Sequence, residues 1–224
     1  MKTKRNLTTK PTFHSYPVLA NETKGLAVDE DILRRIESQF DYAEATKSKA
    51  LFYRLDLRYP DGAKVPADNA HFSHFASAYM KNLSRQGLKP QYFAVREQSK
   101  RHNGCHYHMG IILDGQKTRN PYGHLDIAER LWEHVLELPP REGGYGLVNR
   151  CDKDKDGERM LNGMMLDPNR DNYEDLKDTC FRRSSYLAKE NTKGTPKGVR
   201  EYFASRLPKE YLPAKPKKSK ANKE

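Results

Sequence analysis

Two strand-like runs joined by a short turn constrain the fold of this chain more than any other feature. They span Gln91–Ser99 and Cys105–Asp114, and the five residues between them end in Asn103-Gly104, a dipeptide typical of β-hairpin turns. The two strands of a hairpin are antiparallel neighbours in one sheet. The sequence therefore predicts antiparallel pairing between these two runs.

Further elements alternate along the chain around this hairpin. Apolar residues at helical spacing, beginning with Ile32, Leu33 and Ile36, predict a helix from Asp29 to about Ala43. The same reasoning predicts helices over Asn69–Gln86, Leu125–Leu138 and Asn172–Glu190, and strands over Leu51–Tyr59 and Tyr145–Asp152. Strands that are close in sequence and alternate with helices are typical of an α+β sandwich.

The length of 224 residues suits one domain with extra helices, or a domain with tails. Residues 1–27 show no apolar periodicity and are expected to form a flexible basic arm before a domain over residues 28–207. Residues 208–224 end in a Lys-rich stretch that is expected to be a disordered tail.

The charge balance points to a polyanionic partner. Lys and Arg number 41 against 30 Asp and Glu, a formal net charge of +11, so nucleic acid is the first candidate. No apolar stretch approaches the ~18 residues of a membrane helix. There is no secretory signal, and three cysteines do not make a disulfide framework, so a cytoplasmic protein is expected. No phosphate-binding G-x-x-x-x-G-K-[ST] loop occurs, so no nucleotide cofactor is expected.

A candidate metal site lies in the second strand of the hairpin. His106 and His108 are two residues apart, so their imidazoles share one face of the strand, while Tyr107 and Met109 point into an apolar layer. Glu97 lies on the preceding strand and is the best candidate for a carboxylate ligand. A structural zinc site that also uses Cys105 and His102 is an alternative.

A second candidate site lies late in the chain. Tyr186 and Lys189 are three residues apart and would share a helix face, to which Arg182 and Arg183 add positive charge. A phenol with a pKa of about 10 is a poor nucleophile unless cations or a metal-activated electrophile assist it. This sequence offers both, so the two candidate sites support each other.

These motifs together resemble the HUH endonucleases, and their order is similar to that in rolling-circle replication initiators. The resemblance rests on His-Tyr-His at residues 106–108, the upstream Glu97, and Tyr-x-x-Lys at residues 186–189. Over residues 28–207 the chain looks most like the YagK/YfjJ-type proteins of enterobacterial prophages and the inovirus-type replication proteins. Leu51–Tyr59 departs from the Thr-rich first strand motif of such initiators, because it carries Asp56 and two arginines.

The resemblance implies a central antiparallel sheet, ferredoxin-like or RRM-like, with helices packed on it. It also implies that Glu97, His106 and His108 hold Mg²⁺ or Mn²⁺ at a scissile phosphate. Tyr186 would then attack, leaving a 5′-phosphotyrosine link and a free 3′-OH, while Lys189 offsets the developing charge.

The expected partner is single-stranded DNA at a replication origin, together with a host helicase and polymerase. The candidates for phosphate contacts are Arg182, Arg183, Lys193, Lys197 and Arg200. Conjugative relaxases and small single-strand transposases share this mechanism and stay open as roles. A non-catalytic DNA-binding regulator, with a structural zinc or a decayed active site, is the alternative from another class.

Overall fold

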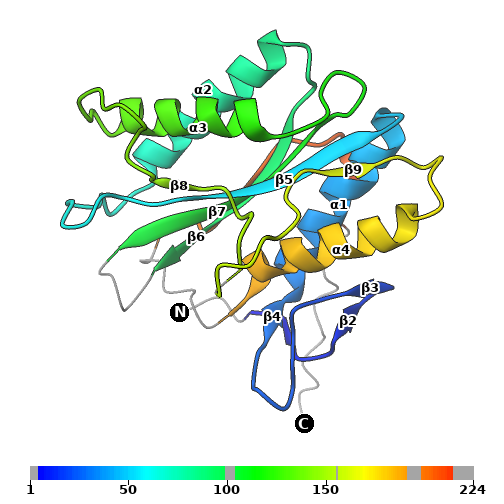
Figure 1. The fold of residues 1–224 in the computed structure, drawn as a ribbon. Coiled ribbons are helices and arrows are strands. Elements are labelled where there is room, and N and C mark those ends of the chain that lie inside the picture. Colours follow the sequence, from blue (N-terminus) through cyan, green and yellow to red (C-terminus); the bar gives the residue numbers. More distant parts are fainter. Residues whose placement is uncertain (1–4, 99–103, 155, 191–197, 214–224) are drawn as a thin grey trace.

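The computed structural model describes residues 5–98, 104–154, 156–190 and 198–213, and its centre is a six-stranded antiparallel sheet (Figure 1). The strand order is β10-β6-β7-β5-β8, and β9 also pairs with β5. The strands are β5 (Ala50–Leu57), β6 (Gln91–Gln98), β7 (Cys105–Asp114), β8 (Val148–Asn149), β9 (Met164–Leu166) and β10 (Tyr202–Ala204). The expected hairpin strands therefore form as β6 and β7, and they lie inside the sheet.

Helices cover both faces of the sheet (Figure 1). Helices α2 (Ala70–Arg85) and α3 (Tyr122–Val135) pack on one face, and α1 (Glu30–Thr46) and α4 (Tyr173–Ser185) pack on the other. The α+β class, with a mainly antiparallel sheet and helices packed on it, is thus confirmed.

Alternation along β7 separates the two faces. Tyr107, Met109 and Ile111 are fully buried in the apolar core beneath α2 and α3. His106 and His108 point to the opposite face, toward α1 and α4. The predicted division of this strand into an apolar side and a histidine side is confirmed.

The N-terminal segment differs from the loose arm expected for residues 1–27. Strand β1 (Leu7–Thr8) pairs with β4 (Val28–Asp29), and β2 (Thr12–Phe13) pairs with β3 (Tyr16–Pro17). Phe13 is buried, and both its ring and the Tyr16 ring stack on Phe181 of α4. Two-residue strands anchored by isolated aromatic residues leave no periodic pattern in the sequence. At the other end, the Tyr211 ring packs on Tyr42 of α1, and residues 214–224 lie outside the described residues.

The last helix ends earlier than the range Asn172–Glu190 predicts. α4 stops at Ser185, a short 3-10 turn η1 (Tyr186–Ala188) follows, and the chain then becomes extended. Lys189 forms a β-bridge with Val28, and the Glu190 N–H donates to the Ala27 carbonyl. Pairing with the N-terminal segment therefore replaces the last helical turn. A second short 3-10 turn, η2 (Lys209–Tyr211), closes the described chain.

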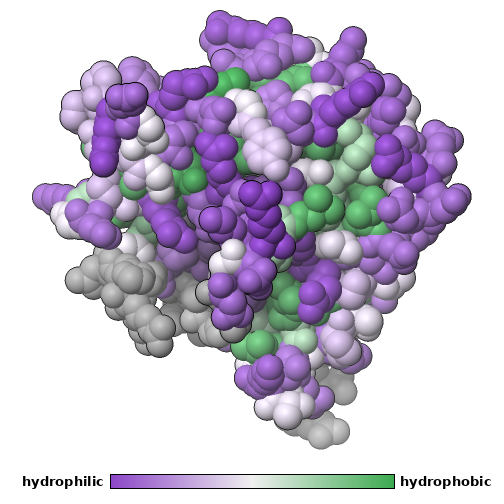
Figure 2. Space-filling model, viewed as in Figure 1, coloured by the Kyte–Doolittle hydropathy of each residue, from purple (hydrophilic) through white to green (hydrophobic). Residues whose placement is uncertain are grey.

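The surface of the molecule is largely polar. Figure 2 shows one face on which hydrophilic side chains predominate and hydrophobic ones appear only in small areas between them. Among the described residues, every helix is too short or too polar to cross a membrane.

The close packing of β6 on β7 can be tested at Gly110, which lies opposite Phe93. A Cβ atom at Gly110 would lie 2.4 Å from the buried Phe93 ring, which itself stacks on Phe52. We expect Gly110→Ala to lower the free energy of unfolding in urea by about 1–3 kcal/mol through overpacking. Gly123→Ala is the control, because a Cβ atom there meets open space at the start of α3. Equal stability of the two variants would contradict this packing.

Candidate functional site

Strand register brings the predicted metal ligands together. Glu97 in β6 pairs directly with His106 in β7, and His108 in β7 pairs on its other side with Asp56 in β5. Residues that are directly opposite in an antiparallel pair point to the same face of the sheet. All four side chains therefore lie on the face that α1 and α4 cover.

The ligand atoms of three of these residues converge. The two histidine Nε2 atoms are 3.1 Å apart, and Glu97 Oε2 lies 3.1 Å from His108 Nε2 and 3.4 Å from His106 Nε2. Glu97 and His108 are buried, whereas the His106 side chain is 24% exposed. The cluster therefore lies at the surface, with its open side at His106.

Asp56 decides which nitrogen of His108 carries a proton. Its Oδ1 atom lies 2.6 Å from His108 Nδ1, so a proton on Nδ1 meets a carboxylate and the lone pair of Nε2 faces Glu97 and His106. Burial lowers the pKa of His108, but Asp56 and Glu97 outweigh it and raise the pKa. Burial raises the pKa of Asp56, but His108 and Arg54 hold that pKa well below its usual range, so Asp56 is ionised.

A divalent metal ion fits this arrangement. Two imidazole nitrogens and one carboxylate oxygen lie within 4.8 Å of one another, and each of these atoms can donate a lone pair to a metal. Such a donor set suits several divalent metals. Glu97, His106 and His108 therefore form a possible metal site, and the identity of the metal does not follow from the geometry.

The alternative zinc site that uses Cys105 and His102 finds no support. Cys105 is buried in the core beneath α2 and α3, on the opposite side of β7 from the two histidines. His102 lies outside the described residues. Within the described part of the chain, only Glu97, His106 and His108 form a group of possible metal ligands.

Tyr186 lies against His108, one of the three possible metal ligands. Its ring meets the His108 ring edge to face, with the centroids 5.0 Å apart. Lys189 Nζ lies 4.2 Å from the centre of the Tyr186 ring, and Arg54 Cζ lies 5.0 Å from it. Burial raises the pKa of Tyr186, as do Glu97 and to a lesser degree Asp56, while Arg54 lowers it; the net pKa is raised. The two predicted sites therefore meet, although Lys189 reaches the ring from extended chain and not from a shared helix face.

The predicted phosphate contacts are dispersed. Arg182 is exposed on α4, whereas the Arg183 guanidinium donates to the Leu161 carbonyl and, at 2.7 Å, to the Cys151 carbonyl. Arg183 thus holds a neighbouring loop in place. Arg200 stands over the Phe203 ring, in a hollow of about 480 Å³ between α2 and β10 on the opposite face of the sheet. Lys193 and Lys197 lie outside the described residues.

Sequence reasoning did not assign Arg54, Asp56 and Asn162 to the site. The Asn162 side chain bonds both backbone groups of Arg54, accepting from its N–H at 2.9 Å and donating to its carbonyl at 2.8 Å. The available signal was the alternation of Arg54 and Asp56 on one face of a strand that otherwise reads as apolar. This alternation could not be linked to the histidines from the sequence, because nothing in the sequence shows that β5 lies beside β7.

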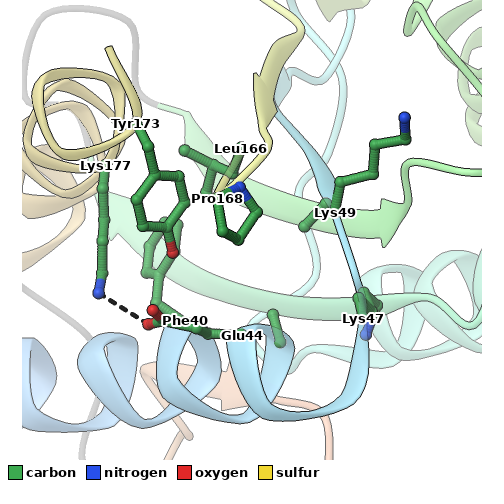
Figure 3. A pocket seen from close by; sticks show the side chains of 10 residues that line it. Phe40, Glu44, Lys47, Lys49, Leu166, Pro168, Tyr173 and Lys177 are labelled. Atoms are coloured by element: carbon green, nitrogen blue, oxygen red, sulfur yellow. Dashed lines mark hydrogen bonds and ion pairs between the residues drawn. The ribbon is translucent and has the colours of Figure 1, made fainter. Parts of the chain in front are cut away.

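A separate small cavity lies at the other end of β5, between α1 and α4 (Figure 3). Its volume is about 20 Å³, and Lys177 of α4 reaches across to Glu44 of α1 at 2.7 Å. Lys49 points away from the cavity in Figure 3. Such a space holds about one water molecule, so it is a packing gap and not a substrate site.

A family model matches nearly the whole described chain. The model of the YagK/YfjJ C-terminal domain covers residues 8–205. The chain belongs to this family. No curated protein matches the sequence. The YagK/YfjJ match begins within the packed N-terminal segment and ends directly after β10, so it includes Glu97, His106, His108 and Tyr186.

Metal binding at this site is testable directly. We expect the wild-type protein to bind Mn²⁺, and Glu97→Gln or His106→Asn to weaken that binding at least about tenfold, since each removes one of three ligands. His134→Asn, an exposed histidine of α3, is the control and should bind Mn²⁺ as the wild type does. Isothermal titration calorimetry on protein stripped with a chelator measures all four. Unchanged affinity in both ligand variants would place the metal elsewhere.

Proposed function

We propose that this YagK/YfjJ-family protein is an HUH-type endonuclease that nicks single-stranded DNA and transfers the cut strand. In this role it would initiate rolling-circle-type replication of a phage, prophage or other mobile element. The observation that carries the proposal is the contact between the Tyr186 ring and His108, which joins a phenol to a possible metal site.

The proposed reaction is a transfer of the phosphoryl group to tyrosine. Glu97, His106 and His108 would hold a divalent metal, Mg²⁺ or Mn²⁺, and that metal would supply Lewis-acid polarisation of the scissile phosphate. The Tyr186 oxygen forms a bond to phosphorus while the bond from phosphorus to the 3′ oxygen breaks. The phenol proton is released, and the leaving 3′ oxygen takes up a proton. The products are a 5′-phosphotyrosine link and a free 3′-OH.

Cations beside the tyrosine support this chemistry. Lys189 and Arg54 both lie against the Tyr186 ring, where they oppose the negative charge that develops on the phenol oxygen and the phosphate. The partly exposed His106 leaves the open side of the cluster accessible to a DNA strand. The formal net charge of +11 favours a nucleic-acid partner.

The biological setting is part of the same proposal. The YagK/YfjJ family suggests an association with prophages, and a replication initiator would act in the bacterial cytoplasm at an origin. The chain would depend on a host helicase and a host polymerase, which extends the free 3′-OH. Relaxase or transposase roles use the same chemistry and differ only in the DNA that is cut.

A covalent adduct is the direct test. The protein is incubated with Mn²⁺ and single-stranded oligonucleotides that tile the DNA around its own gene, and denaturing gels reveal any protein–DNA adduct. We expect Tyr186→Phe to abolish the adduct while DNA binding persists, because the phenol oxygen is the nucleophile. Tyr122→Phe, on a tyrosine that is 55% exposed in α3, is the matched control and should react as the wild type does.

Two results would contradict the proposal. One is an adduct that survives Tyr186→Phe. The other is the absence of an adduct on every tile, although the wild-type protein binds both Mn²⁺ and DNA. The second result would favour a non-catalytic DNA-binding regulator.

A further inference from the structure

One carboxylate oxygen connects the metal ligands to the tyrosine. Asp56 Oδ1 lies 2.6 Å from His108 Nδ1 and 3.3 Å from Arg54 Nη2. Both charged side chains of β5 are nearly inaccessible, each residue being 8% exposed. The oxygen that orients His108 therefore also holds the guanidinium of Arg54.

Arg54 in turn packs on the tyrosine. Its guanidinium carbon lies 5.0 Å from the centre of the Tyr186 ring, and its Nη1 atom donates to the Arg183 carbonyl at 3.0 Å. The Asn162 side chain bonds the Arg54 backbone on both sides. The guanidinium is thus fixed at three points: Asp56, the end of α4, and the aromatic ring.

We propose that Asp56 and Arg54 form a bridge that positions Tyr186 relative to the metal ligand His108. Both are positioning residues: Asp56 orients His108 for metal binding, and Arg54 transmits that placement to the tyrosine ring. The inference rests on the proposed nicking function for its consequence in catalysis. The effects of the bridge on the position of Tyr186 and on metal affinity do not depend on that function.

Side-chain chemistry explains why these residue types suit the role. A guanidinium is planar and has several donors, so it can bond a carboxylate at its edge while its face or edge meets an aromatic ring. A lysine ammonium is a point charge and cannot do both in one orientation. An asparagine at position 56 has no charge and can present a donor to His108, which would favour the wrong tautomer.

Mn²⁺ binding distinguishes the role of Asp56 from that of Arg54. Asp56→Asn should weaken Mn²⁺ binding at least about tenfold, as expected when the partner of a metal-ligating histidine is lost. Arg54→Met leaves all three ligands and Asp56 in place, so its Mn²⁺ affinity should stay within about threefold of the wild type, a change too small to reflect loss of a ligand or its partner. If both residues only stabilised the fold, the two substitutions would change the Mn²⁺ affinity to a similar extent.

The position of Tyr186 is read by fluorine NMR on metal-free protein labelled with 3-fluorotyrosine. The Tyr186 resonance is identified by its absence in Tyr186→Phe. We expect Arg54→Met to move this resonance toward the position of unfolded chain, because the ring loses the guanidinium that packs on it. Arg54→Lys serves if the methionine variant does not fold. Arg150→Met is the control, since Arg150 pairs with Asp126 at 2.6 Å on an exposed surface.

Adduct formation provides the third measurement. At saturating Mn²⁺, single-turnover formation of the adduct should slow at least about tenfold in Arg54→Met, because misplacement of a reacting group by about 1 Å is costly. An unchanged Tyr186 resonance in Arg54→Met, or unchanged Mn²⁺ affinity in Asp56→Asn, would overturn the bridge. Absence of any adduct with wild-type protein would overturn the proposed function alone, because the NMR and Mn²⁺ measurements do not depend on activity.

Discussion

The register of β7 between its two neighbours is the constraint on which the site depends. It sets Glu97 opposite His106 and Asp56 opposite His108. A slip of one residue would turn the histidines into the apolar core beneath α2 and α3 and move the residues now buried there to the face under α1 and α4, because successive side chains alternate between faces. Burial of large side chains such as Tyr107, Met109 and Ile111 stabilises the fold by roughly 1.5–3 kcal/mol each. The hydrophobic side of β7 therefore enforces the geometry of its histidine side.

The opposite face of the strands buries charge at a cost. Arg54, Asp56, Glu97 and His108 are all nearly inaccessible. Removing a charge from water destabilises a fold unless a partner of opposite charge is well placed, and an apolar pair of similar size is often the more stable choice. Asp56 has two cationic or proton-donating partners in Arg54 and His108, and the Glu97 carboxylate lies beside two imidazoles that could bind a metal together with it. A bound cation would reduce the cost of burying the two carboxylates.

Sequence patterns predicted the parts of the site that depend on local geometry. The hairpin signal and the period of two gave the pairing of β6 with β7, and hence Glu97 beside the two histidines. The place of Arg54 and Asp56 in the site was not predicted, because the neighbours of β5 are set by the packing of the whole sheet. The ordered structure of residues 5–27 was not predicted, because its short strands are held by distant partners such as Phe181 of α4. The sequence predicts the proximity of Lys189 and Tyr186 from a shared helix face, but the contact forms after α4 has ended, where Lys189 lies in extended chain.

The early end of α4 links that segment to the tyrosine. The hydroxyls of Ser184 and Ser185 donate to carbonyls one turn earlier, Cys180 and Arg182, and Ser185 also accepts the N–H of Leu19. The following turn carries Tyr186, and β-pairing of Lys189 with Val28 then draws the chain out of the helix. A helix that ran on to residue 190 would leave Val28 without this partner and carry Lys189 around the helix axis. The N-terminal segment therefore fixes the chain on both sides of Tyr186, and the buried Arg54 of β5 packs on its ring. Each of these regions lies far from the others in the sequence, so only the assembled fold can place the phenol against His108.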